Sequence, residues 1–170
     1  LKHLLKRTPE LNQLRMCNIV ENTIYWKKLV RVAFGSTREL GGKEEFIQEL
    51  TTREWDNHVL FTISSIFGVS RPDELYTTAI IDLGKLFSFI GILGGESNRA
   101  YYFPGFNAHN EFFYLDPHYC LPAREGYGDS AEVAKEYFGT NFRQIHLSKM
   151  STSMTFCFLL KGKDDFRELF

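Results

Sequence analysis

Three short runs of aromatic and β-branched residues, separated only by turn-forming residues, constrain the fold of this chain most strongly. The runs are FIGIL (89–93), AYYFPGF (100–106) and EFFYL (111–115), and they are joined by GGESNR and NAHN. Gly and Asn adopt the backbone conformations of tight turns more readily than other residues do. The series therefore predicts neighbouring antiparallel strands with short connections between them, and NAHN as a hairpin connection.

The rest of the chain predicts helices and further strands. Predicted helical segments are 1–5 (broken near Pro9), 18–34 (loosely helical), 43–50, 70–87 (with Ser70 as N-cap) and 163–170. The other predictions are strands at 58–68 and 154–160, the second continuously apolar, a polar loop with a short helix at 126–139, and an extended or irregular segment at 142–150. Helices that precede a mostly antiparallel sheet indicate an α+β fold, in a single domain over 1–170.

Composition excludes some classes of function. The net charge of −1 gives no basic field for nucleic acid or acidic lipid, and no apolar run approaches the roughly 20 residues of a membrane span. Cys17, Cys120 and Cys157 are sparse and far apart, which favours a reducing, cytoplasmic setting over a disulfide framework. Because the first residue is Leu, we expect the chain to be part of a longer protein.

The pair Asp116 and His118, with only Pro117 between them, follows the third aromatic run. In an extended chain, residues i and i+2 point to the same face, so the carboxylate could orient the imidazole and leave its other nitrogen as a base. Pro117 places the pair at a strand end or edge. The alternative interpretation is an Asp-Pro turn followed by a surface histidine.

The surroundings of this pair resemble the autophagins, the cysteine proteases that process the ubiquitin-like modifier of autophagy. The similar elements are a glycine turn with Gly94, Gly95 and Asn98, an aromatic strand with Ala100, Tyr102, Phe103 and Gly105, and the motif Leu115-Asp116-Pro117-His118. The resemblance is strong over 55–170, including WDNHVLFTISSIFG and HLSKMSTSMTFCFLLKGKDDF, and faint over 1–54.

The resemblance implies a papain-like fold, of which this chain holds mostly the β-rich half with flanking helices. Asp116 would orient His118, which would deprotonate a cysteine thiol and later protonate the leaving amine. The implied substrate-binding residues are Gly94, Gly95, Ser97, Asn98 and Tyr102. The implied partner is the modifier, soluble or lipid-conjugated, cut after glycine or released from lipid, without cofactor and with transient membrane proximity only through the substrate.

Some family features are missing. No tryptophan-glycine-cysteine block is present, Ser97 stands where the family's gating loop carries proline, and Ala33 lies beside Phe34 where a substrate-clamping tryptophan is expected. We interpret Cys17 and Cys157 as core residues, and Cys120 as too close in sequence to His118 to serve as nucleophile. The nucleophile is therefore expected on a missing upstream part. The alternative is a non-catalytic module that binds the modifier.

Other patterns in the sequence are explained by ordinary structural roles and not by a second functional site. The set His109, Asp116, His118 and Cys120 matches no zinc-ligand spacing, so no metal is expected. LGGESN lacks the Lys-Ser/Thr of a phosphate loop. The aromatic-x-x-aliphatic pattern Phe166–Leu169 resembles motifs that dock on the modifier, but helix packing explains Phe166 more simply. His58 and His146 have no evident partners in the sequence and are interpreted as structural.

Overall fold

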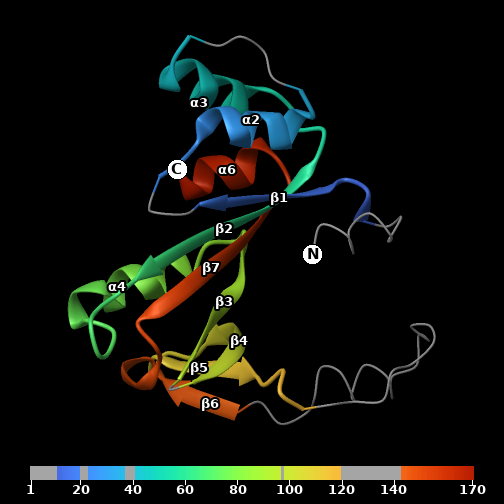
Figure 1. Ribbon diagram of the computed structural model, residues 1–170. Coiled ribbons are helices and arrows are strands. Elements are labelled where there is room, and N and C mark those ends of the chain that lie inside the picture. The colour runs from blue at the N-terminus through green and yellow to red at the C-terminus, as the bar shows by residue number, and fades with distance from the viewer. Residues whose placement is uncertain (1–10, 20–22, 37–40, 97, 120–142) are drawn as a thin grey trace, which may run out of the picture.

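The computed structural model describes residues 11–19, 23–36, 41–96, 98–119 and 143–170. In these parts the chain forms one seven-stranded sheet with helices packed against it (Figure 1). The strands are β1 (Leu14–Ile19), β2 (His58–Ile66), β3 (Phe89–Glu96), β4 (Arg99–Phe106), β5 (Glu111–Leu115), β6 (Arg143–His146) and β7 (Ser153–Leu160). The helices are α2 (Trp26–Phe34), α3 (Lys43–Thr52), α4 (Glu74–Leu83) and α6 (Lys163–Leu169), with a 3-10 turn, η2, at Leu147–Lys149.

The strand order in the sheet is β1-β2-β7-β3-β4-β5-β6. β1 and β2 are parallel, and every other neighbouring pair is antiparallel. The three aromatic runs are neighbours in the predicted order, as β3, β4 and β5, whereas β7 comes from the end of the chain and lies between β2 and β3. The prediction of a mixed, mostly antiparallel architecture is therefore confirmed.

The glycine pair lies inside a strand and not in the turn that we predicted. Gly94 and Gly95 belong to β3, and the chain reverses between Glu96 and Arg99, which face each other across the hairpin. Asn98 has a left-handed backbone, with φ of 67°, which asparagine tolerates better than most residues. A Cβ on Gly95 would lie 1.8 Å from the carbonyl oxygen of Arg99. Close strand approach, and not turn formation, therefore requires glycine at this position.

The NAHN connection between β4 and β5 is a hairpin, as predicted. The side-chain oxygen of Asn107 accepts hydrogen bonds from the backbone N–H groups of His109 (2.9 Å) and Glu111 (3.2 Å). Asn110 takes the left-handed conformation with φ of 59°. Asparagine thus supplies both the side-chain acceptor and the unusual backbone conformation that this short turn needs.

Two helix predictions were wrong in their bounds. The helix predicted over 70–87 is α4, and its N-cap is Asp73, whose carboxylate accepts from the N–H of Leu75 at 3.0 Å, and not Ser70. The segment predicted as loosely helical from residue 18 begins with the end of strand β1, and its helix starts only at Trp26. In β1, the buried residues Cys17 and Ile19 alternate with an exposed residue, which is the period of a strand. The loosely helical spacing of the residues that follow hid this alternation in the sequence.

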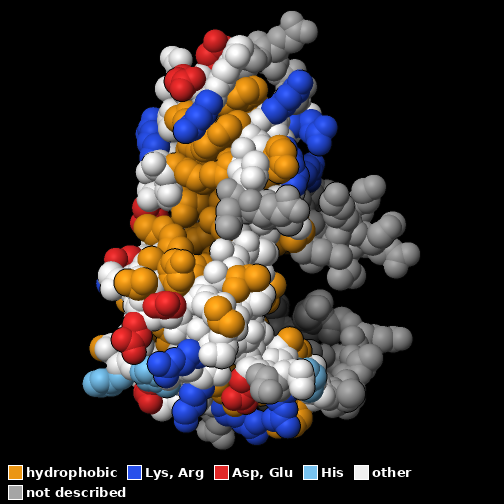
Figure 2. All heavy atoms as spheres, turned by 60° about the vertical axis from the view of Figure 1, so that its left-hand side comes forward, with side chains coloured by type: hydrophobic (Ala, Val, Ile, Leu, Met, Phe, Trp, Pro, Cys, Tyr) orange, Lys and Arg blue, Asp and Glu red, His pale blue; other side chains and the backbone are white. Residues whose placement is uncertain are grey.

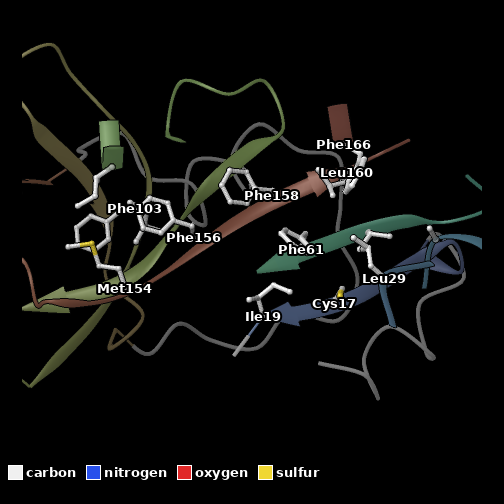
Figure 3. Close-up of a cluster of buried hydrophobic side chains, with 14 of the residues drawn as sticks. Cys17, Ile19, Leu29, Phe61, Phe103, Met154, Phe156, Phe158, Leu160 and Phe166 are labelled. Carbon is white, nitrogen blue, oxygen red and sulfur yellow. The ribbon is translucent and has the colours of Figure 1, made fainter. Parts of the chain in front are cut away.

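The hydrophobic core lies between one face of the sheet and the helices. Figure 3 shows buried side chains from β1, β2, β4 and β7 spread along the sheet. Leu29 of α2 and Phe166 of α6 lie at the end of the cluster near Phe61, whereas Phe103 of β4 lies at the other end. The labelled members are Cys17, Ile19, Leu29, Phe61, Phe103, Met154, Phe156, Phe158, Leu160 and Phe166, all of them buried. Helices α2, α3 and α6 gather at the β1 end of the sheet, and β4, β5 and β6 form the other end (Figure 1).

The final helix and two histidines have structural roles. Phe166 of α6 is fully buried and packs near the rings of Trp55 and Phe170, so helix packing is confirmed for the Phe166–Leu169 pattern. His58 and His146, for which the sequence showed no partners, do have them. The Nδ1 atom of His58 lies 3.2 Å from the carbonyl oxygen of Lys161, and Nδ1 of His146 accepts from the N–H of Ser148 at 3.2 Å to cap η2.

The surface also carries large apolar side chains. Figure 2 shows hydrophobic side chains over the middle of one face, with Lys and Arg toward its two ends. The most exposed apolar residues of the described chain include Val69, Leu75 and Phe87. None of the described helices combines the length and apolar character that a membrane span requires.

Candidate active site

Asp116 and His118 lie in a turn directly after β5. The strand ends at Leu115, and Pro117, which has no N–H, cannot continue the hydrogen-bonding ladder. The Oδ1 atom of Asp116 accepts from the backbone N–H of His118 at 3.0 Å and lies 2.6 Å from its ring Nδ1. The predicted contact between Asp116 and His118 is therefore present. We had derived it from an extended chain, which was wrong, because a turn capped by the Asp116 side chain produces it.

The contact selects one tautomer of the histidine. An ionised carboxylate only accepts hydrogen bonds, so Nδ1 of His118 carries a proton in this contact, and in the neutral ring Nε2 keeps its lone pair. The backbone N–H of His118, then its ring, and more weakly the charge of Arg143 lower the pKa of Asp116. The Asp116 side chain is only 10% exposed, whereas that of His118 is 52% exposed. The arrangement therefore presents an accessible basic nitrogen backed by a shielded carboxylate.

An aromatic platform from β4 supports the histidine ring. The rings of Tyr101 and His118 pack in a T-shaped arrangement, with a centroid distance of 6.4 Å and an interplanar angle of 88°. Tyr101 also stacks on Tyr114 of β5 at 4.3 Å, and its hydroxyl donates to Glu96. We had interpreted Tyr101 from the sequence as a residue of the sheet core, and it is buried, but we had not predicted its contact with His118.

A groove of about 690 Å³ borders the pair. It is lined by residues 93–96 of β3, residues 98–102 of the hairpin and β4, Pro117, and three hydroxyl residues, Ser151, Ser153 and Thr155. Among the residues predicted to bind substrate, the structure brings together Gly94, Gly95, Asn98 and Tyr102 along this groove. Ser97 lies outside the described residues.

The hydroxyl side of the groove was missed from the sequence. We had predicted β7 as a continuously apolar, buried strand, but it begins at Ser153, and its exposed or half-buried Ser153 and Thr155 alternate with buried Met154 and Phe156. This alternation with a period of two was a readable signal. Across the groove, the hydroxyl of Tyr102 donates to the carbonyl of Ile90, which leaves the ring of Tyr102 to line the wall.

The described cysteines lie away from His118. Cys17 is in β1 and Cys157 in β7, and both strands are separated from β5 by β3 and β4 in the sheet. Both thiols are buried, and burial raises the pKa of each, which disfavours the reactive thiolate. Their interpretation as core residues is confirmed. Cys120 lies outside the described residues, so the described part of the site holds an acid and a base but no thiol.

The set His109, Asp116, His118 and Cys120, from which no metal site was expected, includes one residue, Cys120, that lies outside the described parts of the chain. Within those parts, no three His, Cys, Asp or Glu side chains converge in a way that could hold a metal ion. Ala33 and Phe34, at the place where a clamping tryptophan was expected, are buried, and Phe34 packs edge-on against Trp55 at 6.3 Å. These two residues therefore contribute to the core and not to the groove.

Comparison with known proteins identifies a family and several similar proteins. A family model described as the peptidase C54 catalytic domain matches residues 1–170. "Cysteine protease 1" of Neurospora crassa is 34% identical over 110 residues, which cover 62% of this chain and 22% of that protein. "Cysteine protease ATG4" of Saccharomyces cerevisiae is 28% identical over 126 residues (74% and 24%), and "Cysteine protease ATG4D" of Xenopus laevis is 31% identical over 122 residues (70% and 25%). The match thus spans about a quarter of the length of these relatives.

Proposed function

The chain belongs to the peptidase C54 family, and from this premise we propose that it supplies the acid and base of a cysteine protease of autophagy. The observation that carries the proposal is the 2.6 Å contact between Asp116 and Nδ1 of His118 at the border of the groove. A base whose second nitrogen is held by a carboxylate is the arrangement that activates a nucleophilic thiol. The relatives that support this assignment are named cysteine proteases.

The proposed reaction is acyl transfer through a thioester. Nε2 of His118 takes the proton of a cysteine thiol, and the thiolate attacks the carbonyl carbon of the scissile bond. The resulting imidazolium gives its proton to the leaving amine as the C–N bond breaks. Water, deprotonated by the same nitrogen, then hydrolyses the thioester and regenerates the thiol. Asp116 stabilises the imidazolium and keeps the ring in one orientation throughout.

The proposed substrate is the C-terminal tail of the ubiquitin-like modifier of autophagy, cut after its glycine, with the same chemistry releasing the modifier from lipid. The groove supports this proposal because it runs along the hairpin residues Gly94, Gly95 and Asn98 and reaches the Asp116–His118 turn, where Pro117 also lines it. The hydroxyl groups of Ser151, Ser153 and Thr155 offer hydrogen-bond partners to peptide groups on the same path.

We further propose that the nucleophile comes from a part of the polypeptide outside the described residues. The described thiols, Cys17 and Cys157, are buried and remote from His118. The match covers about a quarter of the relatives' length, so this chain would be one part of a longer papain-like peptidase. In that arrangement a helical part carries the cysteine and the sheet end described above carries Asp116 and His118.

The test is cleavage of a modifier that carries a C-terminal reporter by the native polypeptide that contains this chain. Asp116→Asn and His118→Ala should each lower kcat/KM by roughly 10³- to 10⁴-fold. Asp82→Asn is the matched control, because Asp82 is an exposed carboxylate of α4 paired with Lys85. A thiol alkylator should abolish cleavage. Full activity of Asp116→Asn would overturn the role of the carboxylate.

A second candidate, a non-catalytic module that binds the modifier, is favoured by the burial of both described thiols. It predicts modifier binding without cleavage and no effect of alkylation. The mass of the native protein separates the two candidates. A species well above 19.8 kDa that cleaves the modifier supports the protease, whereas a species of 19.8 kDa that only binds it supports the module.

A further inference from the structure

Arg143 meets the turn of Asp116 and His118 from the edge of the sheet. It is the first residue of β6, and its Cα partner across the ladder is Tyr114 of β5. Directly opposed residues of an antiparallel pair have side chains within contact distance. Tyr114 stands two residues before Asp116, so Arg143 is placed beside the entry of the turn.

Arg143 also contacts the exit of the same turn. Its guanidinium carbon lies 5.5 Å from the ring centroid of Tyr119, the residue that follows His118. A planar guanidinium over an aromatic face at this distance forms a cation–π contact. The side-chain hydrogen bond and charge interaction with Tyr119, followed by a hydrogen bond with Tyr114, raise the pKa of Arg143. One side chain therefore interacts with the residues on both sides of the Asp116–His118 turn.

The charge of Arg143 also acts on the carboxylate. Hydrogen bonds from the backbone and ring of His118 are the main causes of the lowered pKa of Asp116, and the positive charge of Arg143 adds to them. Among the described residues, β3 and β4 bring further charged or titratable groups to this region. A side-chain hydrogen bond with Tyr101 is the main cause that raises the pKa of Arg99, and the charges of Asp116 and Glu96 add to it. Tyr101 is hydrogen-bonded to Glu96 and packs on His118.

We propose that Arg143 is a positioning residue for His118: by joining Tyr114 to Tyr119 it fixes the turn that keeps Nδ1 on Asp116 and leaves Nε2 as the base. This inference rests on the proposed function of the pair and deepens it. Neither the sequence motif nor its spacing indicates it, because Arg143 comes from a different strand. Lysine would keep the charge but lose the planar stacking surface and the fork of donors.

The first readout is the tautomer of His118, measured by ¹⁵N NMR of the imidazole in the 170-residue chain at neutral pH. Wild type should hold the proton on Nδ1. Arg143→Met should shift the ring toward the mixture of Nδ1–H and Nε2–H tautomers found in an unrestrained imidazole. Arg143→Lys should give a tautomer ratio between those of wild type and Arg143→Met. Arg31→Met is the control, since Arg31 is an exposed arginine of α2, which packs at the β1 end of the sheet. Arg31→Met should match wild type.

The second readout is kcat and KM for modifier cleavage by the polypeptide that contains this chain. Arg143→Met should lower kcat by about tenfold or more with KM nearly unchanged, because it disturbs the base and not the groove. A folded Arg143→Met protein with the wild-type tautomer overturns the inference. If Arg143→Met fails to fold, Arg143→Lys decides by the same measurement, and a wild-type tautomer and kcat in that variant overturn it equally.

The two readouts keep this inference separate from the proposed function. A tautomer shift in Arg143→Met together with no cleavage by wild type supports the positioning role and contradicts the protease. If wild type cleaves the modifier, and Arg143→Met changes neither the cleavage nor the His118 tautomer, the result contradicts the positioning role and supports the protease.

Discussion

The carboxylate of Asp116 interacts with two donor groups of a single residue, the backbone N–H of His118 at 3.0 Å and the ring Nδ1 at 2.6 Å. The backbone contact forms the turn and the ring contact orients the imidazole. The same oxygen therefore serves both local structure and the proposed chemistry. Residues from other strands also contact this turn: Tyr101 packs against the imidazole, and Arg143 lies beside Tyr114 and Tyr119.

The first prediction concerns the dependence of stability on pH. The folded-state pKa of Asp116 is lowered, so it lies below the value of about 3.9 expected in the unfolded chain. The stabilisation by its charged form is therefore complete above this value and is lost as pH falls through the lower, folded-state pKa. The urea midpoint of Asp116→Asn should lie below that of wild type at pH 6, and the gap should close as pH falls through the lowered, folded-state pKa of Asp116.

The control for this experiment is Ser64→Ala, which removes a hydroxyl hydrogen-bonded to Thr155 and no titratable group. Its offset from wild type should be the same at every pH at which the protein folds. A gap between wild type and Asp116→Asn that is equally constant would contradict the role of the charged carboxylate in the turn.

The second prediction separates two adjacent glycines. A Cβ at position 95 would lie 1.8 Å from the carbonyl oxygen of Arg99, whereas one at position 94 would meet its nearest atom, in the ring of Phe103, at 3.5 Å. Gly95→Ala must therefore distort the β3–β4 hairpin and should lower the free energy of unfolding by about 2–4 kcal/mol. Gly94→Ala should change it by less than about 1 kcal/mol. Equal effects in urea denaturation would show that the close strand approach is not rigid.

The third prediction tests the interpretation of Phe166. Phe166 is the fully buried residue of α6, whereas Phe87, a residue of the same type, is 82% exposed. Phe166→Ala should lower the free energy of unfolding by about 3–5 kcal/mol, and Phe87→Ala should have an effect within about 0.5 kcal/mol. If Phe166→Ala instead weakened binding of the modifier and left thermal stability intact, Phe166–Leu169 would be a docking motif and not a packed helix.

The fourth prediction concerns thiol reactivity. Cys17 and Cys157 are buried, and burial raises the pKa of each thiol, so iodoacetamide should label them slowly in the native protein at pH 7.5 and rapidly in 6 M guanidinium. Peptide mapping by mass spectrometry after a short exposure measures each site separately. Rapid labelling of Cys17 in the native protein would show that the β1 edge of the sheet opens. Cys17 would then have to be considered again as a nucleophile.

Features that depend on neighbours in sequence could be predicted. The aromatic runs became β3, β4 and β5 because alternating side chains and turn-forming residues act within a few positions. The NAHN hairpin and the Asp116–His118 contact followed for the same reason, since a side chain reaches a residue two positions away in either an extended chain or a turn. The helix bounds were less accurate, because the Asp73 cap competed with a similar signal at Ser70.

The sequence alone determined that the segments of β2, β3, β4, β5 and β7 are strands, that NAHN is a hairpin, and that a carboxylate and an imidazole meet at the end of the third aromatic run. Only the tertiary structure decided that β7 lies between β2 and β3, which places Ser151, Ser153 and Thr155 opposite Gly94 and Gly95 in one groove. Likewise, the pairing of β6 with β5 brought Arg143 beside Tyr114 and Tyr119. The physical reason is that strand order is set by which arrangement of the whole sheet buries the apolar faces of all strands together, and no local pattern encodes that choice.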